Sequence, residues 1–194
     1  VLRLMQAVAL APEMADRFPH QISGGQAQRV VIARALAMKP SLIVCDEPVS
    51  ALDVSVQATV TELLQELQER FDIAYLFISH DLRVVKKLSH RIAVMYLGQI
   101  VEEGPTDPVY RQPMHPYTTA LLAAIPDLST SRTTRTVRLA GDPPSPANPP
   151  SGCHFHTRCP YARPRCSAEM PALRPMGEGR SVRCHFAGEL GVAS

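Results

Sequence analysis

Hydrophobic positions follow helical and strand periods in alternation as far as about residue 126. The apolar segment 1–10 predicts a helix, and Ser23 is a favourable N-cap for a second helix that continues to about Met38. Because this second helix offers little polar surface, we expect it to be mostly buried. Pro40 ends it, since proline lacks the N–H group that a helix interior needs.

Two apolar runs, at 41–45 and 74–78, predict strands. The first run is apolar throughout, which is typical of a strand covered on both faces. The segment 54–71 between them has helical periodicity, with glutamates opposite an apolar stripe. The stripe consists of Val56, Val60, Leu63, Leu64, Leu67 and Phe71.

Further along, Leu97 and Gly98 predict the turn of a hairpin between strands at 91–96 and 99–103. A short helix is expected over 117–124. Helices that alternate with strands in this way predict an α/β fold around a parallel sheet.

Proline, arginine and cysteine dominate beyond residue 126. The segment 126–150 contains too many prolines for a helix interior or a sheet ladder, and it predicts an extended linker. Four cysteines follow the linker. We therefore expect two parts, with a boundary between residues 104 and 105: an α/β domain over 1–104 and an extension over 105–194 that carries the cysteines.

Composition narrows the class of protein. The chain has 194 residues, of which 45% are hydrophobic, as is ordinary for a globular protein. Its net charge of +2 argues against a general binder of nucleic acid or lipid surfaces. No apolar run is long enough to span a bilayer, and no charged-then-apolar leader opens the chain. Val1 falls inside a helical pattern, so we expect that an N-terminal part precedes it in the complete protein.

Ser23, Gly24, Gly25 and Gln26 begin the second helix. The N–H groups of a helix start are unpaired and attract anions, and glycines let an anion approach the backbone closely. The turn therefore predicts a cradle for the terminal phosphate of a nucleotide. An ordinary capped helix is the alternative reading.

Asp46 and Glu47 end the first apolar strand, where the ligands of parallel sheets bind. Adjacent carboxylates repel each other unless a cation lies nearby. Asp46 is suited to hold Mg²⁺ through water, and Glu47 to align and deprotonate an attacking water. His80, at the end of the next strand, is suited to sense the terminal phosphate. A helix-capping pair and a structural histidine are the alternatives.

The order and spacing of these motifs resemble the ATP-binding subunits of ABC transporters. ISGGQ is similar to the family signature, LIVCD to the Walker B strand, Glu47 to the catalytic glutamate, SALD (ending at Asp53) to the D-loop and ISHD to the switch histidine. The resemblance implies a P-loop ATPase core whose helical subdomain contains the signature helix. It also implies ATP and Mg²⁺ as cofactors, and two subunits that sandwich ATP so that Ser23, Gly25 and Gln26 act on the partner's nucleotide.

The chain departs from the family pattern in one respect: it contains no G-x-x-x-x-G-K-[ST] segment. We expect this P-loop to lie in the missing N-terminal half, and we expect the 194-residue chain alone not to hydrolyse ATP.

Four cysteines follow the spacing C-x5-C-x6-C-x17-C: Cys153, Cys159, Cys166 and Cys184. Cys45 lies apart from them in an apolar strand, and we expect it to be a core residue. The spacing is too wide for a paired zinc knuckle but compatible with an iron–sulfur cluster. Four reduced thiols without a metal are the alternative. His154, His156 and His185 lie close in sequence and could also serve as metal ligands, so the number of cysteine ligands stays open.

The segment from about residue 105 to 186, which includes these cysteines, resembles the C-terminal extension of oligopeptide and dipeptide importer ATPases, with His115-Pro116-Tyr117 as its marker. That resemblance implies peptides as substrate, with nickel or another small solute as an alternative, and a [4Fe–4S] cluster on the four cysteines. It also implies a second ATPase subunit, two transmembrane permeases, an indirect solute-binding protein, and a peripheral position on the cytoplasmic face of the inner membrane.

Two rival functions remain. One is a soluble ABC ATPase that acts on the ribosome or on nucleic acid through its basic tail, although we expect no nucleic-acid partner. The other is a non-catalytic scaffold. The tail arginines that would serve the first rival are Arg158, Arg163, Arg165, Arg174, Arg180 and Arg183.

Overall fold

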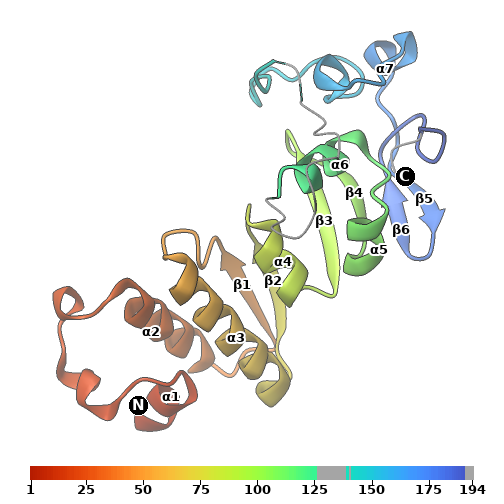
Figure 1. Cartoon of the computed structure of the whole chain (residues 1–194). Coiled ribbons are helices and arrows are strands. Elements are labelled where there is room, and N and C mark those ends of the chain that lie inside the picture. The colour runs from red at the N-terminus through yellow and green to blue at the C-terminus, as the bar shows by residue number, and fades with distance from the viewer. Residues whose placement is uncertain (126–138, 140, 191–194) are drawn as a thin grey trace, which may run out of the picture. The chain divides into compact units, whose positions relative to one another are not determined.

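The computed structural model describes residues 1–125, 139 and 141–190 (Figure 1). It contains two compact units, Val1–Leu88 and Ser89–Ser194. The boundary predicted between residues 104 and 105 concerns functional domains and stays a prediction. Most of the predicted linker over 126–150 lies outside the described residues.

The first unit is a β–α–β crossover preceded by helices. Its helices are α1 (Leu2–Ala7), α2 (Gly24–Leu36), α3 (Val54–Phe71) and α4 (Leu82–Leu88), its 3-10 turns η1 (Pro12–Asp16) and η2 (Pro19–Gln21), and its strands β1 (Leu42–Asp46) and β2 (Ala74–Ile78). The two strands pair in parallel, with Leu42 opposite Ala74 and Asp46 opposite Ile78. Parallel neighbours need a crossover connection, which α3 supplies alongside the sheet (Figure 1).

The core of this unit lies between α3 and one face of the sheet. Val60, Leu63, Leu64 and Leu67 are buried as the stripe predicts, together with residues of α1, α2 and α4. Phe71 is an exception, because it is 45% exposed at the helix end. Asp72 then ends α3 in the left-handed conformation.

Two burial predictions were wrong. In α2 only Ile32 and Leu36 are buried, whereas Val30 and Val31 are each 46% exposed. The second wrong prediction concerns β1, which has only one covered face and exposes Leu42 and Val44 on the other. The physical reason is the same in both cases: an all-apolar element needs partners on every side, and the described elements that pack on these two cover one side only.

The second unit is built on an antiparallel sheet in the order β3–β4–β6–β5 (Figure 1). Its strands are β3 (Arg91–Tyr96), β4 (Gln99–Pro105), β5 (Arg174–Gly177) and β6 (Arg180–Val182), its helices α5 (Thr106–Arg111), α6 (Pro116–Ala123) and α7 (Pro164–Ala168), and its 3-10 turn η3 (His156–Arg158). The predicted hairpin is confirmed: Leu97 and Gly98 both have positive φ, as a type I′ turn requires.

The cysteine region contributes to this sheet, which the sequence analysis did not foresee. Strand β6 pairs with β4 through Glu102 opposite Val182 and Glu103 opposite Ser181. Short strands of three or four residues with little hydrophobic alternation give no clear sequence signal.

Candidate functional site

The Ser23–Gln26 turn forms a reciprocal cap on α2. The Gln26 N–H donates to Ser23 Oγ at 3.3 Å, and the Ser23 N–H donates to Gln26 Oε1 at 2.9 Å. This capping box satisfies two N–H groups of the helix start. Both side chains thus have a structural role in the chain as described, and a phosphate-binding role stays a prediction.

The two glycines of this turn face the beginning of α3. A Cβ atom at Gly25 would lie 2.5 Å from Cγ1 of Val56, which no real contact tolerates, whereas one at Gly24 would lie 3.4 Å from Cδ2 of Leu52. Glycine at position 25 is therefore required by close packing. The structure brings the predicted signature turn against the segment that ends at Asp53.

Asp53 caps α3, since its Oδ1 accepts from the Val56 N–H at 3.0 Å and from the Ser55 hydroxyl at 2.6 Å. The hydroxyl of Ser55 is the main cause that lowers the pKa of the Asp53 carboxyl. The acid that the sequence assigned to a nucleotide site therefore also has an ordinary helix-capping role.

Glu47 and His80 meet at the carboxyl edge of the parallel sheet. Glu47 Oε1 lies 2.9 Å from His80 Nδ1, although the two residues are 33 positions apart in sequence. Because parallel strands end at the same edge, β1 and β2 deliver the two side chains together. The Glu47 backbone has φ of +48°, and its N–H donates to the Ile78 carbonyl at 3.0 Å.

The electrostatics of this pair are those of a carboxylate and a proton-binding ring. The hydrogen bond and charge of Glu47 raise the pKa of His80. The second carboxylate oxygen, Oε2, is buried and has no hydrogen-bond partner among the described residues. The Glu47 side chain as a whole is 38% exposed. An oriented carboxylate that water can reach can accept a proton from it, which is what a general base needs. Asp46 beside it is exposed.

Among the described residues, no hydrogen bond joins the Ser23–Gln26 turn to Glu47 or His80. The family resemblance assigns the turn to the nucleotide of a partner subunit, and Asp46, Glu47 and His80 to the chain's own nucleotide. In the structure these residues form two groups, one at the start of α2 and α3 and one at the end of β1 and β2, and their division between two nucleotides stays a prediction.

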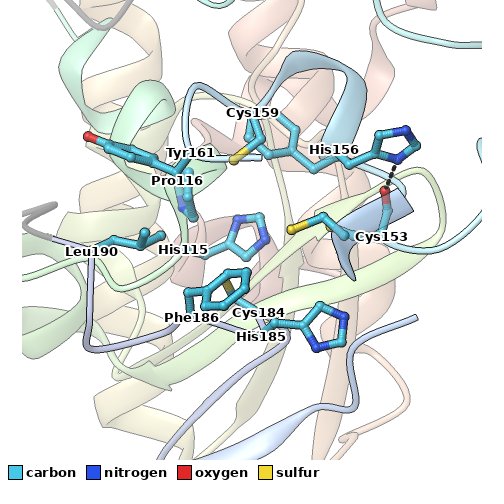
Figure 2. Close-up of a pocket in the computed structure, with 12 residues that line it drawn as sticks. His115, Pro116, Cys153, His156, Cys159, Tyr161, Cys184, His185, Phe186 and Leu190 are labelled. Carbon is cyan, nitrogen blue, oxygen red and sulfur yellow. Dashed lines mark hydrogen bonds between the residues drawn. The ribbon is translucent and has the colours of Figure 1, made fainter. Parts of the chain in front are cut away.

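The four predicted cysteines gather in the second unit. Cys153, Cys159, Cys166 and Cys184 all line one small pocket, which His115, Phe155, His156, His185 and other residues complete (Figure 2). All four are free thiols. Burial raises the pKa of Cys159 to about 11 and also raises the pKa of Cys153 and of Cys184. Any metal bound here would therefore have to displace protons.

The iron–sulfur prediction is not supported by the geometry. Among the described residues, no group of three or more Cys, His, Asp or Glu side chains is arranged to hold a metal ion. A mononuclear zinc ion would need four ligands within about 2.3 Å of one point. A cluster places its thiolates on separate irons, so it asks for thiols around a common space rather than at one point. The pocket meets only the requirement for a cluster, namely that the four thiols surround one common space.

His115 is held firmly in this pocket. It is 1% exposed, and its Nδ1 accepts from the Tyr117 N–H at 3.1 Å at the start of α6. Burial lowers its pKa to about 3, so the ring is neutral. Phe155 packs against the rings of His115, Tyr117 and Tyr96, with centroids 5.6, 5.4 and 5.2 Å away.

The sequence analysis missed Glu102, and it named Arg180 only as a tail arginine and not as the buried partner of Glu102. Glu102 is fully buried and accepts from the Met114 and His115 N–H groups, each at 2.9 Å, and from Arg180 Nη2 at 2.8 Å. Gly104 permits this, since a Cβ there would lie 2.7 Å from the Arg180 stem. Two adjacent glutamates in a predicted strand gave no signal as to which one points inward.

The arginines of the tail are largely used inside the chain. Arg174 donates to the carbonyls of Cys184 and His185, and Arg183 donates to those of Ile100 and Pro171. Arg163 stacks on Phe186 at 4.0 Å. Guanidinium groups committed in this way are poorly placed to contact phosphates, which weakens the nucleic-acid rival.

Family comparisons agree with the two resemblances. Residues 1–50 match the family described as "ABC transporter", and residues 101–166 match "Oligopeptide/dipeptide transporter, C-terminal region". The "Probable peptide ABC transporter ATP-binding protein y4tS" of Sinorhizobium fredii is 58% identical over 182 residues, which are 94% of this chain and 52% of that protein. The chain belongs to the ATP-binding subunits of the oligopeptide/dipeptide ABC transporter family.

Other members of this peptide-transporter family match equally broadly. The "Oligopeptide transport ATP-binding protein OppF" of Escherichia coli is 54% identical over 89% of this chain and 52% of its own length. The "Di/tripeptide transport ATP-binding protein DppF" of Pseudomonas aeruginosa is 49% identical over 96% and 58%. The chain thus spans about half the length of these curated relatives.

A solved structure described as the ADP conformation of MJ1267, an ATP-binding cassette of an ABC transporter, has the same fold over part of the chain. It is 30% identical, with a TM-score of 0.52, and the match covers 57% of this chain and 44% of that one. The predicted α/β cassette fold is therefore confirmed. No helix among the described residues has the length and apolar character needed to cross a bilayer.

Proposed function

We propose that this chain is the C-terminal part of an ATP-hydrolysing subunit that energises the import of di- and oligopeptides. The observation that carries the proposal is the 2.9 Å contact between Glu47 and His80 at the carboxyl edge of β1 and β2. Peptide transport is named for the relatives described above, and this supports the substrate class. Import of nickel or another small solute is the alternative.

In this proposal Glu47, whose side chain is 38% exposed and oriented by His80, aligns the attacking water and accepts its proton. His80 holds Glu47 in place and donates toward the terminal phosphate. Asp46, exposed beside Glu47, would hold Mg²⁺ through water. ATP would supply the phosphoanhydride bond, and bound Mg²⁺ would neutralise charge that develops on the phosphates.

The turn at the start of α2 would act on the nucleotide of a second subunit. We assign this role to Ser23, Gly24, Gly25 and Gln26, with Asp53 in the adjoining segment. Two such subunits would dock on two transmembrane permeases, as peripheral subunits on the cytoplasmic face of the inner membrane. A solute-binding protein would deliver the peptide from the other side.

The test uses the full-length subunit that contains this chain, co-expressed with its permeases and reconstituted in vesicles. Glu47→Gln should reduce the rates of ATP hydrolysis and of peptide uptake at least a hundredfold, because general-base catalysis contributes about 10²–10⁴-fold. ATP binding should persist. The control is Glu62→Gln, which alters an exposed glutamate of α3 paired only with Lys87. Turnover that survives Glu47→Gln would overturn the proposal.

A second proposal concerns the cysteine pocket. We propose that Cys153, Cys159, Cys166 and Cys184 hold a [4Fe–4S] cluster with a structural role, because all four residues line one pocket. The donor set suits a cluster, which binds each thiolate at a different iron. The cluster would stabilise the second unit through its bonds to segments that are distant in sequence.

Anaerobic purification, followed by iron, sulfide and zinc analysis, tests this second proposal. About four irons and four sulfides per chain are expected for a [4Fe–4S] cluster, and Cys159→Ser should reduce both. Zinc in place of iron, or a protein without either metal, would count against the cluster. Neither result would affect the proposal for Glu47.

A further inference from the structure

The loop 47–53 joins the end of β1 to the start of α3 and begins with Glu47 (Figure 1). Glu47 has φ of +48°, a left-handed conformation that residues with a Cβ atom rarely adopt because it costs conformational energy. Such a conformation persists only where the surrounding contacts hold it in place. The direction of the Glu47 carboxylate therefore depends on the contacts that hold this loop.

The first contacts lie at Glu47 itself. Its N–H donates to the Ile78 carbonyl of β2 at 3.0 Å. Its carbonyl accepts from the Ser50 N–H at 3.3 Å and from the Ser50 hydroxyl at 3.0 Å. Because Ser50 is exposed and belongs to the same loop, its two bonds shape the turn without fixing the loop against the rest of the unit.

Val49 connects the loop to the rest of the first unit. Its side chain is 1% exposed and belongs to the hydrophobic core. Its carbonyl accepts from the Leu52 N–H at 3.2 Å and from Gln57 Nε2 at 2.8 Å. The bond from Gln57 is partly buried, and a hydrogen bond shielded from water is stronger than an exposed one. The Gln57 amide thus fixes the main chain of the loop from α3, two residues after Glu47.

The position of Gln57 is itself well defined. Its N–H donates to the Asp53 carbonyl at 2.8 Å, and its carbonyl accepts from the Thr61 hydroxyl at 2.7 Å. The residue before it, Val56, is the one that packs closely against Gly25. The first turns of α3 therefore contact the predicted signature turn through Val56 and the Glu47 loop through Gln57.

We propose that Gln57 is a positioning residue for ATP hydrolysis, whose amide holds the Val49 carbonyl and thereby keeps the Glu47 carboxylate directed at His80 and at the attacking water. The inference rests on the proposed role of Glu47 as the general base. Its physical basis is that a base acts only within hydrogen-bond reach of the water and in a fixed direction. A displaced base lowers the rate of the chemical step and leaves ATP binding unchanged.

Two substitutions and a matched control separate positioning from simple stabilisation. Gln57→Met removes the amide donor and keeps the length of the side chain. Gln57→Asn keeps the amide but shortens the side chain by one methylene group, so that the amide falls short of the Val49 carbonyl. The control is Gln65→Met, because Gln65 also lies on α3, is half-buried like Gln57 and donates to a backbone carbonyl, that of Lys87, at 2.9 Å.

The first measurement is ATP hydrolysis by the full-length subunit with its permeases, together with the thermal unfolding temperature of each variant. Both methionine variants should unfold about 2–4 °C below the wild type, because each loses one hydrogen bond. Gln57→Met and Gln57→Asn should lower kcat about tenfold to a hundredfold while KM for ATP stays unchanged. Gln65→Met should keep the wild-type kcat.

The second measurement follows the contact between Glu47 and His80 in the 194-residue chain, through the nitrogen NMR resonances of the His80 ring at constant pH. Glu47→Gln provides the resonance position for a broken contact. Gln57→Met should move the Nδ1 resonance toward that position, because Glu47 Oε1 no longer stays 2.9 Å from the ring. Gln65→Met should leave the resonance where it is in the wild type.

A wild-type kcat in Gln57→Met or Gln57→Asn would overturn the inference and leave the role of Glu47 intact. An equal loss of kcat in Gln65→Met, or an unmoved His80 resonance in Gln57→Met, would also overturn it, because Gln57 would then act only on stability. Turnover that survives Glu47→Gln would overturn the proposed function and this inference with it.

Discussion

Glu102 Oε1 lies 2.8 Å from Arg180 Nη2, and the two side chains are 0% and 2% exposed. The pair joins β4 to β6 across 78 positions of sequence, and the same carboxylate holds the loop before α6. A buried ion pair contributes little by itself, but removal of one partner leaves an uncompensated charge. The first prediction follows from this asymmetry.

Arg180→Met should destabilise the second unit by about 3–5 kcal/mol, because Glu102 would remain buried without its guanidinium. Urea unfolding followed by tyrosine fluorescence measures this, since Tyr96, Tyr110, Tyr117 and Tyr161 all lie in that unit and only Tyr75 does not. Arg165→Met is the matched control in the same unit. It breaks an exposed 2.9 Å pair with Glu169 and should change stability by about 1 kcal/mol at most. Equal effects of the two substitutions would contradict the buried pair.

Gly25→Ala should destabilise the first unit by about 1–3 kcal/mol, since its Cβ would meet Cγ1 of Val56 at 2.5 Å. The measurement is the free energy of unfolding from circular dichroism at 222 nm. Adding Val56→Ala should recover part of the Gly25→Ala loss, because it removes the clashing methyl groups. Gly24→Ala is the control and should be neutral or slightly stabilising, since alanine is the better helix former and its Cβ meets Leu52 at 3.4 Å. If Val56→Ala recovered nothing, the packing explanation for Gly25 would be wrong.

The ring of His80 should titrate above the ordinary histidine value of about 6.5, because Glu47 stabilises the protonated form. The pair therefore stabilises the fold fully below the unfolded pKa and loses this contribution as pH rises through the raised folded pKa. NMR titration of the His80 Cε1–H measures it. In Glu47→Gln the pKa of His80 should fall toward the ordinary value. Asp81→Asn removes only the weaker charge interaction of Asp81 with the ring and should lower that pKa less. If Glu47→Gln left the pKa of His80 unchanged, the contact between the two side chains would be ruled out.

Leu97→Asn should stabilise the β3–β4 hairpin by up to about 1 kcal/mol, because Leu97 has φ of +45° and asparagine tolerates this conformation better. Gly98→Ala, at φ of +76°, should destabilise it even though nothing lies within 4 Å of the added Cβ. Thermal unfolding of both variants gives the comparison. A destabilising Leu97→Asn would mean that the half-buried leucine side chain contributes more than the backbone strain costs.

Much of the architecture was predictable from sequence because local rules decided it. The N-cap Ser23, the stripe on α3 and the Leu97–Gly98 turn each depend on residues within one element, and each was found where the pattern placed it. The Ser23–Gln26 box also shows the limit of such rules, because the same four-residue pattern predicts both a capped helix and a phosphate cradle, and the structure shows the cap. Periodicity alone could not say how many faces of α2 or β1 would be covered.

The sequence by itself determined the family, the order of the motifs and the elements on which they lie, because short-range spacing and residue type carry that information. Only the tertiary structure decided which distant residues meet. It brought Glu47 to His80 through parallel pairing, closed the Glu102–Arg180 pair between strands far apart in the chain, and gathered four cysteines and His115 around one pocket. Such contacts depend on strand register and chain reversal, and no local pattern encodes the register between segments that are separated by dozens of residues.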